Sequence, residues 1–340
     1  MSITPSPPER AAGLARIRDE LATAQRIVLT THMNADGDGA GSEAALASWL
    51  KRTGHDPVIV NPTPFPDLYR FLLEGIDVPA YSPADPAEAS AAAAAARAAD
   101  LVVVLDTAEA PRLGQVMPLI ESHRILTIDH HPPVTPPLGE LSVRDASAAA
   151  TGELIFDLLE GAGAELTLVE SRGLYAAIVT DTGSFRFANT SSRVHQIVAS
   201  LIECGVDPES MYGRLYGGYS RARLALLQRA LAALEVHDEL PVAWIRLTDA
   251  DMKATGADRE DVDGLVEYAR RLKGIEVAVL LRELPEGKTK VSLRTSGSTD
   301  VAAVARELGG GGHVKAAGAL VDAPLDEAIP RLVAALRSHL

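Results

Sequence analysis

Residues 26–39 have the sequence RIVLTTHMNADGDG, in which an apolar, β-branched run is followed by polar residues and glycine. A short run of this kind is typical of a strand that is buried on both faces of a parallel sheet. His32, Asp36 and Asp38 come directly after it, and apolar residues then recur at helical spacing from Ala40 to Arg52. The stretch therefore predicts a buried strand, a polar loop and a helix in succession.

The same alternation continues through the first half of the chain. Further strands are predicted at Pro57–Val60, Leu101–Leu105, Arg124–Ile128 and Leu174–Thr180. A helix is predicted to begin at Asp85-Pro86, with Asp85 as its cap, and to continue through an alanine tract to Ala99. Strands that alternate with helices indicate a parallel, doubly wound sheet.

The pattern changes after Cys204. Residues 213–220 are rich in glycine and tyrosine and predict a linker, and a helix is predicted from Arg221 to Leu234. Further strands are expected near Val242–Leu247, Ile275–Leu284 and Lys290–Thr295. We therefore predict an α/β protein with a doubly wound N-terminal domain (1–213), a linker (214–221) and a smaller C-terminal α/β domain (222–340). The active-site cleft is expected between the two domains.

The composition limits the class of protein. A chain of 340 residues is too long for one comfortable core, which agrees with two domains. One cysteine, Cys204, excludes a disulfide framework and a cysteine-based metal site, and is typical of a reducing cytoplasm. No apolar run approaches the length of about 20 residues that a membrane span needs. Met1–Arg10 lacks an apolar signal core, so a cytoplasmic location is expected.

The negative charge is unevenly distributed. The formal net charge is −14, but residues 241–340 carry 14 Lys and Arg against 15 Asp and Glu, a net of −1. Residues 1–240 therefore carry 18 basic and 31 acidic side chains, a net of −13. Such a balance argues against a long duplex held by electrostatic attraction alone.

Polar side chains that can bind metal follow four of the predicted buried strands. These are His32, Asp36 and Asp38 after the first strand, Asp106 after the second, Asp129, His130 and His131 after the third, and Asp181 after the fourth. In an open parallel sheet, ligands bind at the carboxyl ends of the strands, so these groups are expected to converge. Carboxylates with imidazoles suit Mn²⁺, Mg²⁺ or Fe²⁺, and so many ligands indicate two cations, as in phosphoryl hydrolysis.

Simpler explanations exist for each of these residues alone. A single aspartate after a strand is more often a helix cap or a turn former, and a lone histidine is usually structural. The coincidence at four strand ends favours the metal site. A calcium loop at Asp36–Asp38 is excluded because the twelve-residue pattern with a closing bidentate glutamate is absent.

A second group of candidate residues lies near the C-terminus. Residues 290–296 read KVSLRTS, and residues 309–318 read GGGGHVKAAG. Successive glycines let the backbone approach a ligand and direct its N–H groups at phosphate oxygens. Arg294 can bind a phosphate through two donors, and His313 can donate a hydrogen bond or stack on a base. A flexible turn with a solvated arginine and histidine is the alternative.

Together, these motifs resemble the DHH phosphoesterase superfamily, and the final glycine-rich run resembles the DHH-associated C-terminal domain. The resemblance spans nearly the whole chain. The two-domain layout is most similar to the NrnA-type nanoRNases, which are oligoribonucleases and pAp phosphatases, and less similar to RecJ exonucleases or membrane-anchored cyclic-dinucleotide phosphodiesterases. Ala35 stands where relatives often have proline, which concerns only the stiffness of that turn.

The resemblance implies a role for each matched residue. One cation would take His32, Asp36, Asp106 and Asp181, and the other Asp38, Asp106, His130 and Asp181. Asp129 would orient a neighbouring imidazole, and His131 would face the substrate phosphate, so Asp106, Asp129 and His131 are the expected catalytic residues. Arg294, Ser296, the backbone of Gly310, Gly311 and Gly312, and His313 would hold the terminal phosphate and base.

The resemblance also implies the reaction. Two Mn²⁺ ions, or Mg²⁺ or another divalent metal, would assist hydroxide attack on short oligoribonucleotides, dinucleotides and pAp, which would yield nucleoside monophosphates. A homodimer is expected from family habit. The alternatives are a cyclic-dinucleotide phosphodiesterase, a single-strand exonuclease, a polyphosphatase and a nucleotide-binding regulator without activity.

Overall fold

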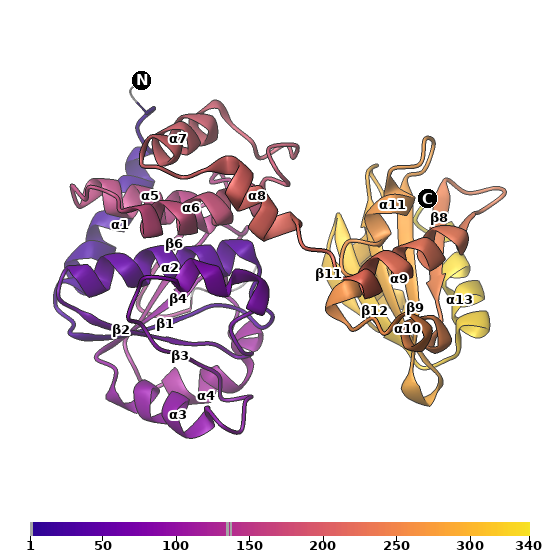
Figure 1. Ribbon diagram of the computed structural model, residues 1–340, viewed down its shortest axis with the longest axis horizontal. Helices are drawn as coiled ribbons and strands as arrows, with labels where there is room; N and C mark the ends of the chain where they lie inside the picture. Colours follow the sequence, from indigo (N-terminus) through magenta and orange to yellow (C-terminus); the bar gives the residue numbers. More distant parts are fainter. Residues whose placement is uncertain (1–2, 134–135, 137) are drawn as a thin grey trace. The chain divides into compact units, whose positions relative to one another are not determined.

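Short apolar runs form a six-stranded sheet in the first part of the chain (Figure 1). The computed structural model describes residues 3–133, 136 and 138–340. The strands are β1 (Arg26–Thr30), β2 (Asp56–Val60), β3 (Ala80–Tyr81), β4 (Leu101–Leu105), β5 (Ile125–Asp129) and β6 (Leu141–Arg144). They run parallel in the order β3-β2-β1-β4-β5-β6. The parallel, doubly wound sheet predicted from the sequence is confirmed.

Helices cover both faces of this sheet, because successive side chains of a strand point to opposite faces. Ile27 and Leu29 of β1 belong to one core cluster and Val28 belongs to the other. The first face carries α1 (Pro8–Leu21), α2 (Gly37–Arg52), α5 (Thr151–Gly161), α6 (Leu168–Asp181), α7 (Ser192–Glu203) and α8 (Pro208–Tyr216). The second carries α3 (Ala89–Ala98) and α4 (Met117–Ile120), which lie below the sheet in Figure 1.

The predicted strand at Leu174–Thr180 is wrong, because these residues belong to α6. A short apolar run is compatible with a buried strand and with a buried helix, and its length alone did not separate the two. The missed signal lies upstream, where Thr167 and Glu170 form a capping box: each side chain accepts a hydrogen bond from the other residue's backbone N–H.

Two helix boundaries also differ from the prediction. The helix expected from Asp85-Pro86 begins at Ala89, and the Asp85 carboxylate instead accepts a hydrogen bond from the Ala87 N–H within a turn. The segment predicted as a linker from residue 214 is helical through Tyr216, because α8 continues to that residue. Helix α9 then begins at Arg221, which leaves residues 217–220 as the connection.

Helices α2 and α6 pack closely because each carries a glycine at the contact. A Cβ atom on Gly173 would lie 2.6 Å from the carbonyl oxygen of Gly41, and a Cβ atom on Gly41 would meet the carbonyl oxygen of Gly173. A larger residue at either position would push the two helices apart. This contact brings the N-terminal end of α2, with Asp38, near the C-terminal end of α6, with Asp181.

The chain divides into two units, Met1–Gly217 and Gly218–Leu340. The second contains a mixed sheet in the order β11-β12-β10-β9-β8-β7. Its strands are β7 (Leu234–Val236), β8 (Val242–Leu247), β9 (Val277–Leu284), β10 (Lys288–Thr295), β11 (Gly311–His313) and β12 (Ala316–Val321). Strands β8 and β9 are parallel and the other pairs are antiparallel. The smaller α/β fold predicted for the C-terminal part is confirmed.

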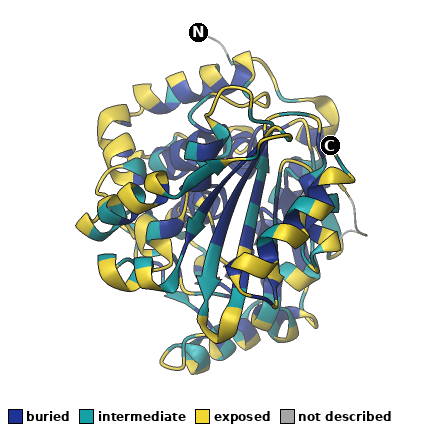
Figure 2. Cartoon of the chain, turned by 90° about the vertical axis from the view of Figure 1, so that its right-hand side faces the viewer, coloured by how far each residue is buried: buried dark blue, intermediate teal, exposed yellow. Residues whose placement is uncertain are grey.

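Helices also cover the second sheet. One face packs against α12 (Val301–Glu307) and α13 (Leu325–Arg337), and the other against α9 (Arg221–Ala232), α10 (Asp249–Thr255) and α11 (Val266–Arg270). Figure 2 shows buried residues along the central strands and exposed residues on the outer sides of helices. Among the described residues, no helix combines the length and the apolar character that crossing a membrane requires.

A buried ionic cluster fixes α5 against α1 and α7. The Arg10 Nη1 donates to Glu153 Oε1 at 2.9 Å and to Asp157 Oδ2 at 3.1 Å. The Arg193 Nη1 donates to the same oxygen of Glu153 at 2.8 Å, and Arg193 also pairs with Asp157. All four side chains are buried. Removing one partner would leave buried charge without compensation.

We expect Arg10→Met to lower the free energy of unfolding of the first unit by about 3 kcal/mol, because two buried carboxylates lose a donor. The measurement is urea unfolding in a Trp244→Phe background, where Trp49 is the one tryptophan left. Arg26→Met is the control, since the Arg26–Asp100 pair lies at the surface, where solvent screens it and its contribution to stability is small. Equal losses in the two variants would contradict the role of the cluster.

Candidate metal centre

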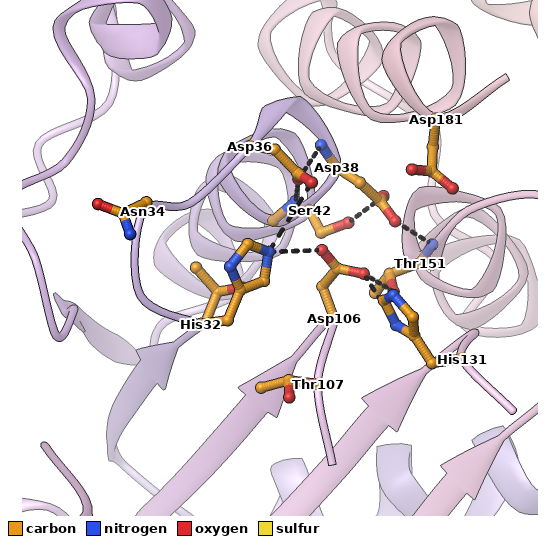
Figure 3. A network of polar contacts seen from close by, with 12 residues as sticks. His32, Asn34, Asp36, Asp38, Ser42, Asp106, Thr107, His131, Thr151 and Asp181 are labelled. Atoms are coloured by element: carbon orange, nitrogen blue, oxygen red, sulfur yellow. Dashed lines mark hydrogen bonds and ion pairs between the residues drawn. The ribbon is translucent and has the colours of Figure 1, made fainter. Parts of the chain in front are cut away.

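Carboxylates and imidazoles gather at the carboxyl edge of the first sheet (Figure 3). His32 lies two residues beyond β1, Asp106 directly follows β4, and Asp129 is the last residue of β5. Asp181 comes from the end of a helix, α6, rather than from the end of a strand as predicted. The structure nevertheless brings all the sequence-predicted metal ligands into this one region of the first unit.

Two groups of side chains could each hold a cation. In the first group, the His32 Nε2 lies 3.3 Å from Asp106 Oδ2 and 3.8 Å from Asp36 Oδ2. In the second group, the His130 Nε2 lies 3.4 Å from Asp181 Oδ2 and 3.6 Å from Asp38 Oδ2.

Asp106 lies between the two groups. Its Oδ2 faces His32, and its Oδ1 lies 3.5 Å from the His130 Nε2. The Asp106 backbone has φ of 60°, a left-handed conformation that is rare for residues other than glycine. Such strain persists only where the surrounding structure enforces it, and it is common at functional sites.

The donor atoms in this region fit divalent cations. The buried Nε2 atoms of His32 and His130 make no hydrogen bond within the described residues, although carboxylate oxygens surround both. The His32 Nδ1 lies 2.9 Å from the Met33 carbonyl oxygen, to which only a protonated Nδ1 can donate. This tautomer leaves the lone pair on Nε2, as metal ligation requires. Imidazole nitrogen with carboxylate oxygen suits Mn²⁺, Mg²⁺ or Fe²⁺.

The electrostatics of the carboxylates also favour the binding of divalent cations. Burial and the neighbouring Asp106 raise the pKa of Asp38 well above its usual value. Burial, with the charges of Asp36 and Asp181, does the same to the pKa of Asp106, and burial also raises the pKa of Asp181. Cations would relieve this repulsion, because they supply the charge that the protein does not.

Asp129 differs from the other carboxylates because it binds a histidine directly. Its Oδ1 lies 2.7 Å from the His131 Nδ1 and accepts the His131 backbone N–H at 3.0 Å. Burial raises the pKa of Asp129, but the hydrogen bonds and charge of His131 outweigh burial and hold this pKa below its usual value. An ionised Asp129 fixes the His131 ring with its proton on Nδ1.

The N-terminal end of α5 donates to two of the ligands, which the sequence analysis did not foresee. The backbone N–H groups of Thr151 and Gly152 donate to the two oxygens of Asp38, at 2.6 and 2.8 Å. The Thr151 hydroxyl donates to Asp106 Oδ1 at 3.1 Å. A helix N-terminus favours negative charge, so α5 orients these carboxylates and partly compensates them.

Asn189 links the residues just before α5 to the end of α6. Its Nδ2 donates to the carbonyl oxygens of Ala149, at 2.9 Å, and Asp181, at 3.1 Å. The end of α6 and the start of α5 are therefore held together by one side chain. Nothing in the spacing of Asn189 marked it as part of the site.

A buried amide and carboxyl support the strand end before His32. The Asn61 Nδ2 donates to Glu43 Oε2 at 2.9 Å, and the Asn61 Oδ1 accepts the Thr31 backbone N–H at 3.1 Å. Glu43 is fully buried on α2, and burial raises the pKa of its carboxyl to about 8. This residue was not singled out from the sequence, because it falls on the apolar face of the helix.

The sequence-predicted substrate-binding residues lie in the second unit. Arg294, half-buried on β10, donates from Nη1 to the Leu293 carbonyl oxygen at 2.9 Å. Ser296 follows β10 and donates to the Ile275 carbonyl oxygen at 3.2 Å. Gly310 precedes β11, which contains Gly311, Gly312 and His313. The side chain of His313 lies outside the described part of the chain, and the substrate roles of these residues stay predictions.

Comparison with known sequences identifies both units. Residues 26–180 match the DHH family N-terminal domain, and residues 242–340 match the DHHA1 domain. The chain is 35% identical, over 92% of its length and 90% of the relative's, to the bifunctional oligoribonuclease and PAP phosphatase NrnA of Thermus thermophilus. It is 28% identical, over 87% of its length and 89% of the relative's, to the Bacillus subtilis protein of the same name.

Solved structures share the fold. An exopolyphosphatase-related protein from Bacteroides fragilis superposes with a TM-score of 0.90 at 25% identity, and the match covers 96% of each chain. RecJ from Thermus thermophilus, in complex with Mn²⁺, superposes with a TM-score of 0.52 at 15% identity over 99% of this chain and 55% of RecJ. The RecJ comparison supports the fold alone.

We expect Thr151→Val to weaken Mn²⁺ binding roughly 10-fold, because the hydroxyl that orients Asp106 is lost while the backbone donors remain. Titration calorimetry on the metal-free full chain measures the affinity. Thr151→Ser keeps the hydroxyl and should bind Mn²⁺ like the wild type. Wild-type affinity in the valine variant would show that this hydrogen bond does not support the site.

The pKa of Glu43 predicts a pH-dependent stability. The pKa rises from 4.5 in the unfolded chain to about 8 in the folded one, so the folded state binds the extra proton between these values. The free energy of unfolding therefore falls as the pH rises through this window, by about 1.4 kcal/mol per pH unit. Glu43→Gln removes the titrating carboxyl, so the variant does not lose stability through this ionisation as the pH rises. Its stability relative to the wild type should rise by a few kcal/mol between about pH 5 and about pH 9.

The measurement for Glu43 is urea unfolding in the Trp244→Phe background, followed by Trp49 fluorescence in EDTA, so that metal binding does not contribute. The comparison of the two proteins cancels the titration of groups that they share. A stability difference that is the same at both pH values would refute the raised pKa.

Proposed function

This chain belongs to the DHH family, in the group that carries a C-terminal DHHA1 domain, and we propose that it hydrolyses short oligoribonucleotides and dinucleotides to nucleoside 5′-monophosphates and pAp to AMP. The observation that carries the proposal is the pair of ligand groups that share Asp106. Relatives over nearly the full chain are named for these two activities.

The proposed cofactors are two Mn²⁺ ions, with Mg²⁺ or another divalent ion as an alternative. His32, Asp36 and Asp106 would hold one, Asp38, Asp106 and His130 the other, and Asp181 would contribute to both. Bound there, divalent cations would lower the pKa of an attacking water and offset charge on the phosphoryl group. The mixed nitrogen and oxygen donors support this choice of metal.

The side chains near these ligands have separate roles. Asp129 holds His131 in one orientation, with the proton on Nδ1, so that the imidazole can face the substrate phosphate. The ester oxygen that leaves phosphorus takes up a proton as the new bond to the water oxygen forms. Thr151 and the α5 backbone keep Asp38 and Asp106 in place during this change of charge.

The second unit would supply the substrate contacts. Arg294 has the donors for a bidentate grip on a terminal phosphate, and Ser296 and the backbone of Gly310, Gly311 and Gly312 offer further donors. His313 would bind the phosphate or stack on the base. Because residues 1–240 carry a net charge of −13, short substrates are favoured over long polyanions.

One related activity has a specific observation in its favour. The chain is 26% identical, over 70% of its length, to the cyclic-di-AMP phosphodiesterase GdpP of Geobacillus thermodenitrificans. The match covers 36% of that longer protein. A cyclic dinucleotide is therefore the second candidate substrate.

A comparison of substrates tests the proposal. The full chain is incubated with Mn²⁺ and, in parallel, a dinucleotide, pAp, a cyclic dinucleotide, a long single strand and polyphosphate, and product release is followed by chromatography. The dinucleotide and pAp should be consumed fastest. Preferred hydrolysis of polyphosphate or of the long strand would overturn the proposal, and preferred hydrolysis of the cyclic dinucleotide would establish the second candidate.

Asp106→Asn tests whether the shared ligand is required. It should lower kcat for every substrate by more than the roughly 100-fold that loss of an outer partner causes, and it should also lower the bound metal measured by atomic absorption. Asp19→Asn, an exposed aspartate on α1, is the matched control and should behave as the wild type. Full turnover in the Asp106 variant would remove the basis of the proposal.

A further inference from the structure

A row of polar side chains runs along one face of the second sheet. Val291 and Leu293 of β10 pack in the core with α12 and α13. Because side chains alternate along a strand, Lys290, Ser292 and Arg294 project from the opposite face. Lys290 is exposed, and Ser292 and Arg294 are half-buried. This face is therefore open at Lys290 and partly covered at Ser292 and Arg294.

The neighbouring strands complete this face. Arg282 of β9 pairs with Lys290 of β10, and it lies on the same side as Leu280, which packs toward α9 and α11. On the other side of β10, Ser292 pairs with Gly318 of β12. A Cβ atom on Gly318 would lie 3.8 Å from the Lys290 Nζ, so the lysine side chain lies over this glycine. The floor between the cationic side chains is thus formed by small residues.

These cations have little compensation from the protein. Within the part of the chain that the structure describes, the side chains of Arg282 and Lys290 make no hydrogen bond or ion pair, and the Arg294 side chain donates a hydrogen bond to a backbone oxygen. Two acids face these arginines: Asp263 interacts with Arg223, Arg259, Arg282 and Arg294, and Glu267 interacts with Arg294. Burial, and then the charge of Arg259, lowers the pKa of Arg282. The exposed Lys290 and the partly compensated arginines therefore leave this face with an excess of positive charge.

The positively charged side chains lie at two positions along this face of the sheet. Residues two apart on one face of a strand are separated by about 6.6 Å, so Arg294 lies about 13 Å from Lys290 along β10. Leu320 of β12 is opposite Lys290 and is 51% exposed, which gives an apolar surface beside the cation. Two separated positive charges, with an apolar surface beside the one at Lys290, fit successive nucleotides better than a single small anion.

We propose that Lys290 and Arg282 form a distal anion site, which holds an internucleotide phosphate of an oligonucleotide whose terminal phosphate is bound by Arg294. This inference rests on the proposed function. The distal anion site would bind without regard to sequence, because it contacts the backbone. A trinucleotide or longer chain would reach it, whereas pAp would not, so the site would favour oligonucleotides over the single nucleotide.

The kinetic test uses Lys290→Ala, Arg282→Met and the double variant of the full chain with Mn²⁺. For a trinucleotide and a pentanucleotide, kcat/KM should fall about 5- to 10-fold per variant, mainly through KM, since a charged contact to phosphate is lost. Turnover of pAp should stay within about twofold, since no distal contact is made. Arg331→Ala, an exposed cation on α13 at the other face of the sheet, is the charge-matched control.

The salt dependence gives a second readout. The slope of log KM against log salt for the pentanucleotide should become shallower by about 0.7 for each cation removed. A merely structural effect of the substitutions would change KM for pAp as well and would leave this slope unchanged. Either of those results would overturn the distal anion site.

A binding measurement separates the inference from the proposed function. Anisotropy of a labelled pentanucleotide, measured in EDTA, reports affinity without turnover. Weaker binding in the two variants but not in Arg331→Ala would support the distal anion site even if the wild type hydrolysed no oligonucleotide, a result that would refute only the proposed function. Unchanged affinity in both variants would overturn the distal anion site while normal hydrolysis left the proposed function intact.

Discussion

Carboxylates that repel one another are buried together at the carboxyl edge of the first sheet, and the surrounding elements compensate this repulsion. The backbone at the start of α5 donates to Asp38, the Thr151 hydroxyl donates to Asp106, and imidazoles stand between the acids. These contacts orient the carboxylate oxygens, but the pKa values of Asp38 and Asp106 stay raised. Burial is the largest cause in both residues. Bound cations are the remaining source of positive charge that could offset this repulsion. The clustered carboxylates that destabilise the fold are therefore also the groups suited to bind metal.

The two units divide the electrostatic requirements of a reaction on a polyanion. The first gathers carboxylates at the proposed cation sites, and their negative charge would repel phosphate until cations are bound. The second presents Arg282, Lys290 and Arg294 on one sheet face, where Asp263 and Glu267 compensate only part of the positive charge. Under the proposed function, the second unit would supply most of the affinity for the substrate and the first would supply the reactive groups. A net charge of −14 for the whole chain hides this division.

Much of the site could be predicted from the sequence, because parallel strands deliver the residues that follow them to one edge of the sheet. This rule located His32, Asp106 and His130 near one another. Asp181 lies there too, although it ends a helix, since an apolar run of seven residues did not distinguish strand from helix. Thr151 and Asn189 could not be predicted. The Thr151 N–H contacts Asp38 across 113 positions of the chain, and no local pattern encodes such a contact.

The approach of α2 and α6 through Gly41 and Gly173 also governs when the ligand set forms during folding. The ligands extend from residue 32 to residue 181, and Asp181 joins them only after α6 has docked on α2. A cation therefore has no complete site in the early, locally structured chain, unlike a metal bound by one short loop. If α6 docks on α2 after the folding barrier, a bound metal would slow unfolding far more than it would hasten folding.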